Sequence, residues 1–577
     1  MARRFHVELI KPSHYDDDGY VIQWHRSSIP SNSLASVHGL IADCAERRVL
    51  GPDVEIEVES CDECNTVVDV HAVARRIRAA GAGFVGLVGV QSNQFPRALH
   101  LARRLRAAGL TVVMGGFHVS GCISMLPELP PGLRELQDIG VILYAGETEG
   151  RIDDLLRDID RDEPKPVYNF LHDLPGLEAA IAPLLPRSTV GRVLGSYASF
   201  DAGRGCPFQC SFCTIINVQG RKSRYRTAED VEAIVRANFA LGIRHFFVTD
   251  DNFARNRNWE AILDRLIELR QEGMKIRLIL QVDTLCHRIP DFIEKAARAG
   301  CNSVFIGLEN INPQSLAGAK KRQNKIWEYR EMLQAWRRQG VMTWAGYILG
   351  FPTDTPESIA SDIDIIKREL PIDILEFFIL TPLPGSEDHK GLYMKGVAMD
   401  DDLNNYDLEH VTTSHAVMSR EAWAQVYRDA WRRYYTDEHV ETILRRAVHD
   451  GINPRKLADV LTVFSGALGI EGIHPLQVGV LRRKVRRDRR PELPRESPFL
   501  FYPRRVWETT STVAAWVSLW RRYHGMKRRV IADPATKHYL DEALRPITED
   551  AAMPEFVRNY ADKIPRTYGA PRLSAAS

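Results

Sequence analysis

The chain has 577 residues, of which 44% are hydrophobic and 26% charged, and its formal net charge at pH 7 is +1. This composition is ordinary for a folded chain, and the length predicts several domains. A net charge this close to zero gives no indication of a nucleic-acid partner. No apolar run reaches the roughly 18 residues that a membrane-spanning helix needs, and the N-terminus lacks the apolar core of a signal peptide.

Cysteine usage indicates a reducing compartment. The chain has nine cysteines, an odd and low number, and carries no export signal. We therefore expect a cytoplasmic protein without a disulfide framework.

The first third of the chain alternates short apolar strands with amphipathic helices. Strands are predicted at 84–90, 110–116 and 139–146, and helices at 95–109 and 148–159. Such alternation predicts an open parallel sheet, whose ligands bind at the carboxyl ends of the strands. Three loops fall there, at 91–94, 115–121 and 146–148, and on this pattern alone they could equally be simple turns.

A proline-rich segment, assigned as a linker over 166–195, separates this region from a second alternating series. Six strand–helix units follow, with strands near 197–205, 244–251, 275–284, 303–310, 342–352 and 374–386. Six units can curl into a partial barrel with its chemistry at the carboxyl ends of the strands.

Three cysteines lie in one short loop of this series, as Cys206-x3-Cys210-x2-Cys213. Soft thiolates favour zinc, copper(I) or iron–sulfur centres. A closed zinc site needs a fourth ligand, which only the remote Cys286 or Cys301 could supply. Three cysteines on an iron–sulfur cubane would instead leave one iron open to bind a second molecule.

With Phe212 before its last cysteine, this loop resembles the C-x3-C-x-aromatic-C pattern of the radical S-adenosylmethionine (SAM) superfamily. "TDDNF", "GLEN", "GYILGFP" and "LTPLPGS" resemble the strand endings of that family in order, and the similarity covers roughly 196–400. The resemblance implies a 4Fe-4S cluster on Cys206, Cys210 and Cys213, and reductive cleavage of SAM to a 5′-deoxyadenosyl radical. The residues it implies for SAM are Phe212, Asp250, Asp251, Glu309, Gly346, Ile348 and Gly350.

The N-terminal sheet is similar to the cobalamin-binding domain that precedes many radical SAM barrels. The resemblance implies a corrin site lined by Gln91, Ser92, Asn93, Gly115, Gly116, His118, Gly146 and Glu147. The Asp-x-His-x-x-Gly motif of histidine-ligated cobalamin domains is missing, since the nearest match, at 69–74, lacks the glycine. We therefore expect cobalamin without a histidine below the cobalt, and a sheet without cofactor remains the alternative.

From about 404 the pattern is mainly helical, with one or two amphipathic helices over 420–448. Between 481 and 530 there are 15 Lys and Arg against 4 Asp and Glu, together with "FLFYPRRVW" and two tryptophans on one helical face. Three interpretations stay open: contact with a membrane interface, contact with nucleic acid, and a helix packed on the barrel with a solvated basic edge. The final residues, 570–577, are expected to form a loose tail.

Two further motifs are interpreted conservatively. The "CDEC" pair at 61–64 is expected to be two free thiols, because no second pair lies at zinc spacing. "KRQNK" at 321–325 could contact an anionic substrate but is expected to be a solvated loop.

The sequence thus predicts an α/β protein in four parts. These are a Rossmann-like cobalamin-binding sheet (1–165), the linker (166–195), a partial (β/α)6 radical SAM barrel (196–403) and a mainly helical region (404–577). The expected function is cobalamin-dependent methylation of an unactivated carbon. A radical cyclisation or rearrangement and a non-catalytic cobalamin sensor are the alternatives, whereas tRNA methylthiolation would need further cluster cysteines that the chain does not arrange.

The expected partners are a small-molecule or lipid-like substrate and an external electron donor of the flavodoxin or ferredoxin type. A peripheral contact at the inner face of the membrane is also considered, and nucleic acid is not expected.

Overall fold

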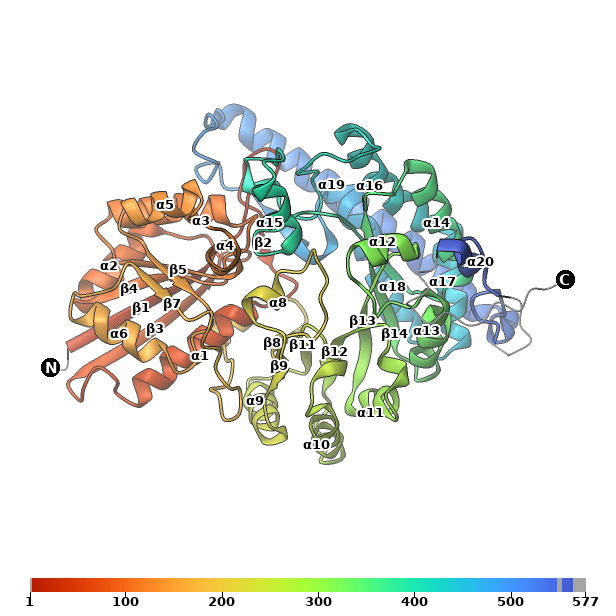
Figure 1. The fold of residues 1–577 in the computed structure, drawn as a ribbon, viewed down its shortest axis with the longest axis horizontal. Helices are drawn as coiled ribbons and strands as arrows, with labels where there is room; N and C mark the ends of the chain where they lie inside the picture. The colour runs from red at the N-terminus through yellow and green to blue at the C-terminus, as the bar shows by residue number, and fades with distance from the viewer. Residues whose placement is uncertain (1–2, 547–552, 564–577) are drawn as a thin grey trace.

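The computed structural model describes residues 3–546 and 553–563. Figure 1 shows two parallel sheets beside each other, with a set of helices gathered at the far end of the second sheet. The expected tail at 570–577 lies outside the described residues.

The N-terminal sheet has six parallel strands in the order β3-β1-β4-β5-β6-β7. The strands are β1 (Arg3–Lys11), β3 (Val54–Asp62), β4 (Gly83–Leu87), β5 (Val112–Gly115), β6 (Ile142–Ala145) and β7 (Val167–Asn169). One face packs on α1 (Asn32–Glu46) and α6 (Ile152–Asp160), and the other on α2 (Val70–Ala80), α3 (Phe95–Ala107) and α5 (Pro131–Asp138). Helices on both faces bury the strands, as a parallel sheet requires.

Three strands of this sheet, β1, β3 and β7, were not predicted from the sequence. β1 alternates apolar residues with His6 and Glu8, which are buried as a pair with Nε2 3.2 Å from Oε2. Because two ionisable side chains pair inside the strand, the sequence does not indicate that this segment is buried. β7 has only three residues, and it adds an edge strand to the sheet from within the segment assigned as a linker.

The central sheet is also parallel and has the order β15-β14-β13-β12-β11-β8, as the six predicted units imply. The strands are β8 (Tyr197–Phe200), β11 (His245–Val248), β12 (Arg277–Val282), β13 (Cys301–Glu309), β14 (Met342–Leu349) and β15 (Ile374–Ile379). The intervening helices are α9 (Ala228–Ala240), α10 (Trp259–Gln271), α11 (Phe292–Ala299), α12 (Pro313–Gly318), α13 (Tyr329–Arg338) and α14 (Pro356–Glu369). β8 and β15 form the two edges, so the described sheet is a partial barrel.

The C-terminal region is mainly helical and covers the β15 edge. Its helices are α15 (Glu387–Met394), α16 (Arg420–Tyr434), α17 (Asp437–His449), α18 (Pro454–Gly466), α19 (Pro498–Ala532) and α20 (Glu555–Arg558). The short strand β16 (Val480–Arg483) returns to pair with β2 (Gln23–Arg26) near the N-terminus. Among the described residues, no helix is both long enough and apolar enough to cross a membrane.

The two sheets meet closely at the ends where their loops lie. Gly121 in α4 (Phe117–Met125) approaches the loop before α15, so that a methyl group added there would lie 2.6 Å from the Pro384 carbonyl oxygen. Asn217, in the short helix α8 (Ile215–Val218), donates from Nδ2 to the Gly385 carbonyl oxygen at 2.9 Å and accepts from Ser124 Oγ at 2.8 Å through its own carbonyl. The cysteine loop is therefore held directly against the N-terminal sheet.

Candidate active site

β9 (Gly203–Arg204) and β10 (Arg224–Tyr225) form a short strand pair. The loop that joins them holds the three cysteines, followed by the helix α8. The Cys206 amide donates to the Gly220 carbonyl oxygen at 3.3 Å, and the Cys213 amide to the Cys210 carbonyl oxygen at 3.2 Å. These bonds close the loop on itself. All nine cysteines of the chain are free thiols.

The segment 321–325 lies against this loop, and the expectation that it is solvated is wrong. Lys321, Gln323 and Asn324 are all buried. Gln323 Nε2 lies 3.5 Å from Cys210 Sγ, and the Lys321 ammonium lies 5.8 Å from the centre of the Phe212 ring. This burial cannot be predicted from the local pattern, because charged residues are buried only when partners elsewhere in the fold satisfy them.

The electrostatics of the loop suit a soft metal centre. Burial raises the pKa of Cys213 to about 12 and also raises that of Cys206, so both thiols are neutral until a metal displaces the proton. Burial disfavours the charged form of Lys321, but Glu309 and the Cys210 sulfur outweigh it and raise the Lys321 pKa. The Lys321 ammonium is therefore a permanent cation beside the three sulfurs. Three cysteine sulfurs are the donor set that an iron–sulfur cluster takes.

The two remote cysteines considered for zinc have other roles. Cys286 is buried and accepts a hydrogen bond from Trp336 Nε1 at 3.4 Å, and Cys301 donates to the Ser303 carbonyl oxygen at 3.3 Å. In the described part of the chain, no three His, Cys, Asp or Glu side chains gather into a site for a single metal ion.

The SAM residues implied by resemblance lie around the carboxyl ends of the central strands. Glu309 ends β13 with φ of +63°, a left-handed conformation that is strained for glutamate, and its Oε1 is 2.5 Å from Lys321 Nζ. Phe212 and Ile348 pack together in one small apolar cluster. Glu309 is thus linked to the cysteine loop through Lys321, and Phe212 is part of that loop.

Glycines shape the β14 end of this site. Gly350 has φ of +96°, and a methyl group there would lie 2.0 Å from the Trp423 ring. The Gly350 and Phe351 amides both donate to Asp354 Oδ2, at 2.9 and 3.0 Å, which fixes the turn. At Gly346 a methyl group would press on the rings of Phe305 and Phe378.

Asp250 and Asp251 follow β11 and are largely buried. Burial raises the pKa of each to about 7, and for Asp251 the neighbouring Asp250 charge adds to the effect. Asp250 accepts from the Ala202 amide at 2.6 Å and from Asn256 Nδ2 at 3.1 Å. Asp251 Oδ2 is buried and has no hydrogen-bond partner in the described part of the chain. A buried oxygen without a hydrogen-bond partner is a candidate to bind a polar group of a ligand.

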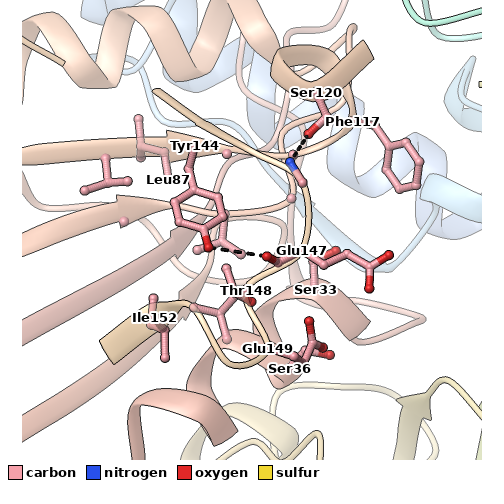
Figure 2. A pocket seen from close by; sticks show the side chains of 18 of the residues that line it. Ser33, Ser36, Leu87, Phe117, Ser120, Tyr144, Glu147, Thr148, Glu149 and Ile152 are labelled. Carbon is pink, nitrogen blue, oxygen red and sulfur yellow. Dashed lines mark hydrogen bonds between the residues drawn. The ribbon is translucent and has the colours of Figure 1, made fainter. Parts of the chain in front are cut away.

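A cavity of about 170 Å³ opens at the carboxyl ends of β4, β5 and β6 in the N-terminal sheet (Figure 2). Its floor is apolar, with Leu87, Tyr144 and Ile152, and its rim carries Ser33, Ser36 and Thr148. Gly115, Gly116, Gly146 and Glu147 line it, as the resemblance implies. Gly116 has φ of +144°, and a methyl group there would lie 2.1 Å from the Val90 amide nitrogen, so only glycine fits.

The other four residues implied for cobalamin lie elsewhere. His118 is buried behind the cavity, with its ring 4.3 Å from that of Phe95 and its Nδ1 3.2 Å from Ser92 Oγ. Asn93 does not line the cavity, and Gln91 lines a second one beside it. Among the described residues, no histidine lines the first cavity.

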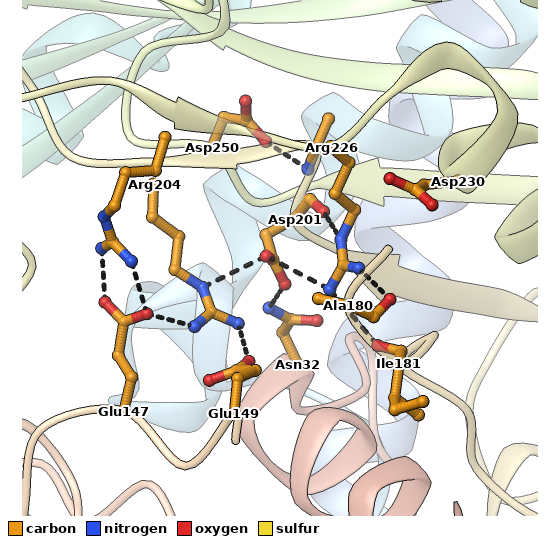
Figure 3. A network of polar contacts seen from close by, with 12 residues as sticks. Asn32, Glu147, Glu149, Ala180, Ile181, Asp201, Arg204, Arg226, Asp230 and Asp250 are labelled. Carbon is orange, nitrogen blue, oxygen red and sulfur yellow. Dashed lines mark hydrogen bonds and ion pairs between the residues drawn. The ribbon is translucent and has the colours of Figure 1, made fainter. Parts of the chain in front are cut away.

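A network of buried charges joins this cavity to the cysteine loop (Figure 3). Glu147 pairs with Arg204 at 2.7 Å and with Arg224 at 2.5 Å, and Arg204 also pairs with Glu149 at 2.6 Å and Asp201 at 3.1 Å. Arg204 and Arg224 belong to the strand pair that carries the cysteine loop, whereas the glutamates follow β6. We call this set of five residues the charge bridge. Each of its pairs is at least 86% buried on both sides.

A second cavity lies on the barrel side of the charge bridge and adjoins the first. The two share five lining residues, namely Asn32, Ser33, Phe117, Arg204 and Gln219. The second cavity extends to Thr214, next to Cys213, and to Thr249 and Asp251 at the end of β11. Asn32 Oδ1 and Thr249 Oγ1 are, like Asp251 Oδ2, buried without a hydrogen-bond partner in the described chain. We call these two adjoining cavities the chamber.

Known proteins resemble both the barrel and the whole chain. Residues 202–366 match the model of the radical SAM superfamily. The chain is 27% identical over 403 residues to the bacteriochlorophyllide d C-8(2)-methyltransferase of Chlorobaculum tepidum, covering 66% of this chain and 83% of that one. It is 25% identical over 383 residues to the hopanoid C-2 methylase of Rhodopseudomonas palustris, covering 64% and 68%.

Two solved structures share the fold over most of the chain. The methyltransferase TsrM from Kitasatospora setae, with cobalamin and a 4Fe-4S cluster bound, gives a TM-score of 0.57 at 14% identity and covers 92% of this chain and 99% of its own. The cobalamin-dependent enzyme OxsB gives 0.51 at 13% identity and covers 97% and 84%. Residues 202–366 therefore form a domain of the radical SAM superfamily, and the chain as a whole is similar in sequence to methyltransferases and in fold to cobalamin-binding radical SAM enzymes.

Proposed function

We propose that the protein transfers a methyl group from SAM to an unactivated carbon of a small molecule, using a 4Fe-4S cluster and cobalamin. The observation that carries this proposal is the chamber, in which the cavity of the N-terminal sheet adjoins a second cavity that reaches the cysteine loop. A methyl transfer between two bound cofactors needs them to face a common substrate space.

Cys206, Cys210 and Cys213 would hold the cluster, and the fit rests on the donor set and on the buried cation beside it. The bound cluster supplies one electron that cleaves SAM, and the bound cobalamin supplies the methyl group. Lys321 offsets negative charge at the sulfurs, and Gln323 offers an N–H to Cys210. Hydrogen bonds and nearby charges of this kind tune the potential of a cluster.

SAM would lie along the barrel ends between Glu309 and the 346–350 turn. The strained Glu309 backbone aims a carboxylate at the loop, where it can accept from the amino group of SAM. Ile348 and Phe212 give an apolar wall, which suits a nucleoside. Asp251 Oδ2 and Thr249 Oγ1, both without partners, would bind polar groups of SAM or the substrate.

The corrin would lie over Gly115, Gly116 and Gly146, where the backbone leaves room for a flat ring. Ser120 Oγ accepts from the Gly146 amide at 3.1 Å, and Tyr144 donates to the Glu147 carbonyl oxygen at 3.3 Å (Figure 2). These bonds hold the β6 loop in the shape that lines the cavity.

The relatives suggest the class of substrate. One acts on a bacteriochlorophyllide and another on a hopanoid. We propose a small-molecule or lipid-like substrate for this chain as well. We also propose that a flavodoxin- or ferredoxin-type donor supplies the electron in a reducing cytoplasm, since the other six cysteines form no second triplet and all are free.

Isotope-labelled SAM tests the proposal. The purified protein, reconstituted anaerobically with iron, sulfide and cobalamin, is incubated with methyl-labelled SAM, a reductant and an extract of its own cells. We expect a product that carries the labelled methyl group and depends on cobalamin. A product changed without gain of the label would indicate cyclisation or rearrangement, and no SAM consumption by the fully loaded protein would contradict the proposal.

A further inference from the structure

The first half of α19 exposes an unusual run of large apolar side chains. Six residues form the apolar stripe, and their exposed fractions are 88% for Phe499, 71% for Leu500, 65% for Val506, 69% for Trp507, 40% for Val513 and 41% for Val517. The opposite side of the helix is buried on α17 and α18 through Leu519, Tyr523, Met526 and Val530, and near the start of the helix Phe501 packs on Tyr20. The stripe is therefore a second face of a helix whose first face is already packed.

The stripe is flanked by arginines that the fold leaves unpaired. Arg521 and Arg528 follow the stripe on the same side of the helix, whereas Arg487 and Arg495 precede α19 and line a polar cavity shared with His71 and Arg104. All four are exposed, and none forms an ion pair or hydrogen bond with a residue that the structure describes. Most other basic residues of this region are paired, for example Arg504 with Glu496 and Arg490 with Asp402.

The stripe also continues into an apolar groove. Val513 and Val517 form one wall, and Val480, Leu481 and Leu194 form the other. Leu481 and Leu194 are themselves 50% and 43% exposed. Apolar surface thus extends sideways from the helix onto β16, giving a broad patch rather than a single row.

We propose that this surface docks the protein on an anionic lipid bilayer, with the apolar stripe in the headgroup and upper acyl region and the four arginines on lipid phosphates. An interfacial helix carries bulky apolar residues on one side and basic residues beside them, and it lies along the membrane. Each basic residue near an anionic surface adds about 1 kcal/mol of attraction. The lack of a spanning helix among the described residues is consistent with docking along the surface.

Charge decides between a bilayer and a second copy of the chain. In a two-fold dimer through the stripe, the unpaired arginines of the two copies would face one another. Like charges brought together in a partly dry interface are unfavourable, whereas anionic headgroups pair with all four. With the lipid-like substrate of the proposed function, docking would bring the protein to the membrane that contains this substrate. Vesicle binding itself needs neither cofactors nor catalysis.

Vesicle sedimentation tests the proposal with the full-length reconstituted protein. Vesicles of phosphatidylcholine with phosphatidylglycerol should carry the protein into the pellet, and vesicles of phosphatidylcholine alone should carry much less. At about 1 M salt, where the screening length is only about 3 Å, binding to the anionic vesicles should fall sharply. Protein that stays in the supernatant with anionic vesicles at low salt overturns the proposal.

Substitutions separate the surface from the rest of the protein. Phe499→Ser with Trp507→Ser should weaken vesicle binding by about tenfold or more, because two inserted rings are lost. Arg487→Glu with Arg495→Glu should weaken it on anionic vesicles and remove most of the salt dependence. The matched control is Val417→Ser, at a side chain that is 59% exposed outside the surface, and it should bind like the wild type.

Two measurements exclude other occupants. Brominated acyl chains should quench Trp507, so the quenching should drop in Trp507→Phe while binding persists. If instead Phe499→Ser with Trp507→Ser turns a dimer into a monomer by light scattering and vesicle binding is absent, the surface belongs to a second copy and the proposal is wrong. Methyl transfer measured without vesicles stays a separate result, so failure of docking does not imply failure of the proposed function.

Discussion

The two sheets of this protein have the same size and direction but make their ligand sites differently. In the N-terminal sheet the strand order turns back at β1, which lies between β3 and β4, and a cavity opens next to that turning point. In the central sheet neighbouring strands follow one another along the chain, so no such point exists. Its site comes from curvature and from loops at the strand ends.

The chemistry of the two sites differs in the same way. The N-terminal cavity relies on glycines and an apolar floor, which suit a large flat ligand. The barrel end relies on thiols, carboxylates and a buried lysine, which suit an ion and a zwitterion. The charge bridge holds the two sheets together at the place where their cavities adjoin, and this contact creates the chamber.

The largest expected effect comes from the cysteine loop. Cys210→Ala should lose most of the bound iron and reduce SAM cleavage by about a thousandfold or more, because one iron loses its protein ligand. Iron analysis and the yield of 5′-deoxyadenosine measure it. Cys61→Ser, at a free thiol of the N-terminal sheet, serves as the control and should keep both.

A smaller effect should come from the N-terminal cavity alone. Gly116→Ala places a methyl group 2.1 Å from the Val90 amide nitrogen, so the loop must move away from the corrin face. A strain of about 2 kcal/mol would weaken cobalamin binding by about thirtyfold. Absorbance titration measures it, with Gly81→Ala as control, since Gly81 also has positive φ (+86°) but has no atom within 4 Å of an added methyl group. If Gly116→Ala and Gly81→Ala bind cobalamin with equal affinity, the corrin site does not lie at Gly116.

The charge bridge tests the link between the sheets. Arg224→Gln leaves Glu147 with one partner instead of two and should lower methyl transfer about tenfold while SAM is still cleaved. The ratio of methylated product to 5′-deoxyadenosine is the measurement. Glu147→Gln added to Arg224→Gln should restore part of the ratio, and Arg47→Gln, at a half-exposed ion pair with Asp153, should change nothing. A proportional loss of both products would show that the bridge only supports the fold.

The smallest effect concerns pH. The pKa of Asp251 is raised by burial to about 7, above its unfolded value of about 3.9. The folded state therefore binds the proton more tightly, and stability of the cofactor-free protein falls as the pH rises from about 4 to about 7. Asp251→Asn should make that fall shallower, as urea midpoints at several pH values would show. An unchanged slope would mean that Asp251 is solvated in the free protein.

Sequence patterns predicted the parts of the fold that repeat. The six barrel units and the helix–strand alternation after 83 follow from apolar periodicity, and the cysteine loop follows from its spacing. β1 was missed because the His6–Glu8 pair masks a buried strand, and the 321–325 segment was misjudged because its partners Glu309 and Cys210 are not its neighbours in sequence. The charge bridge was out of reach for the same reason, since Glu147 and Arg224 meet only after both sheets have formed.

The shared chamber can be tested by electron paramagnetic resonance. The protein is loaded with cobalt(II) cobalamin alone, with the reduced cluster alone, and with both. If the two cofactors face one chamber, the spectrum of the doubly loaded protein should be broadened or split by coupling between the two spins. A spectrum equal to the sum of the two single ones, at full occupancy of both cofactors, would contradict the account.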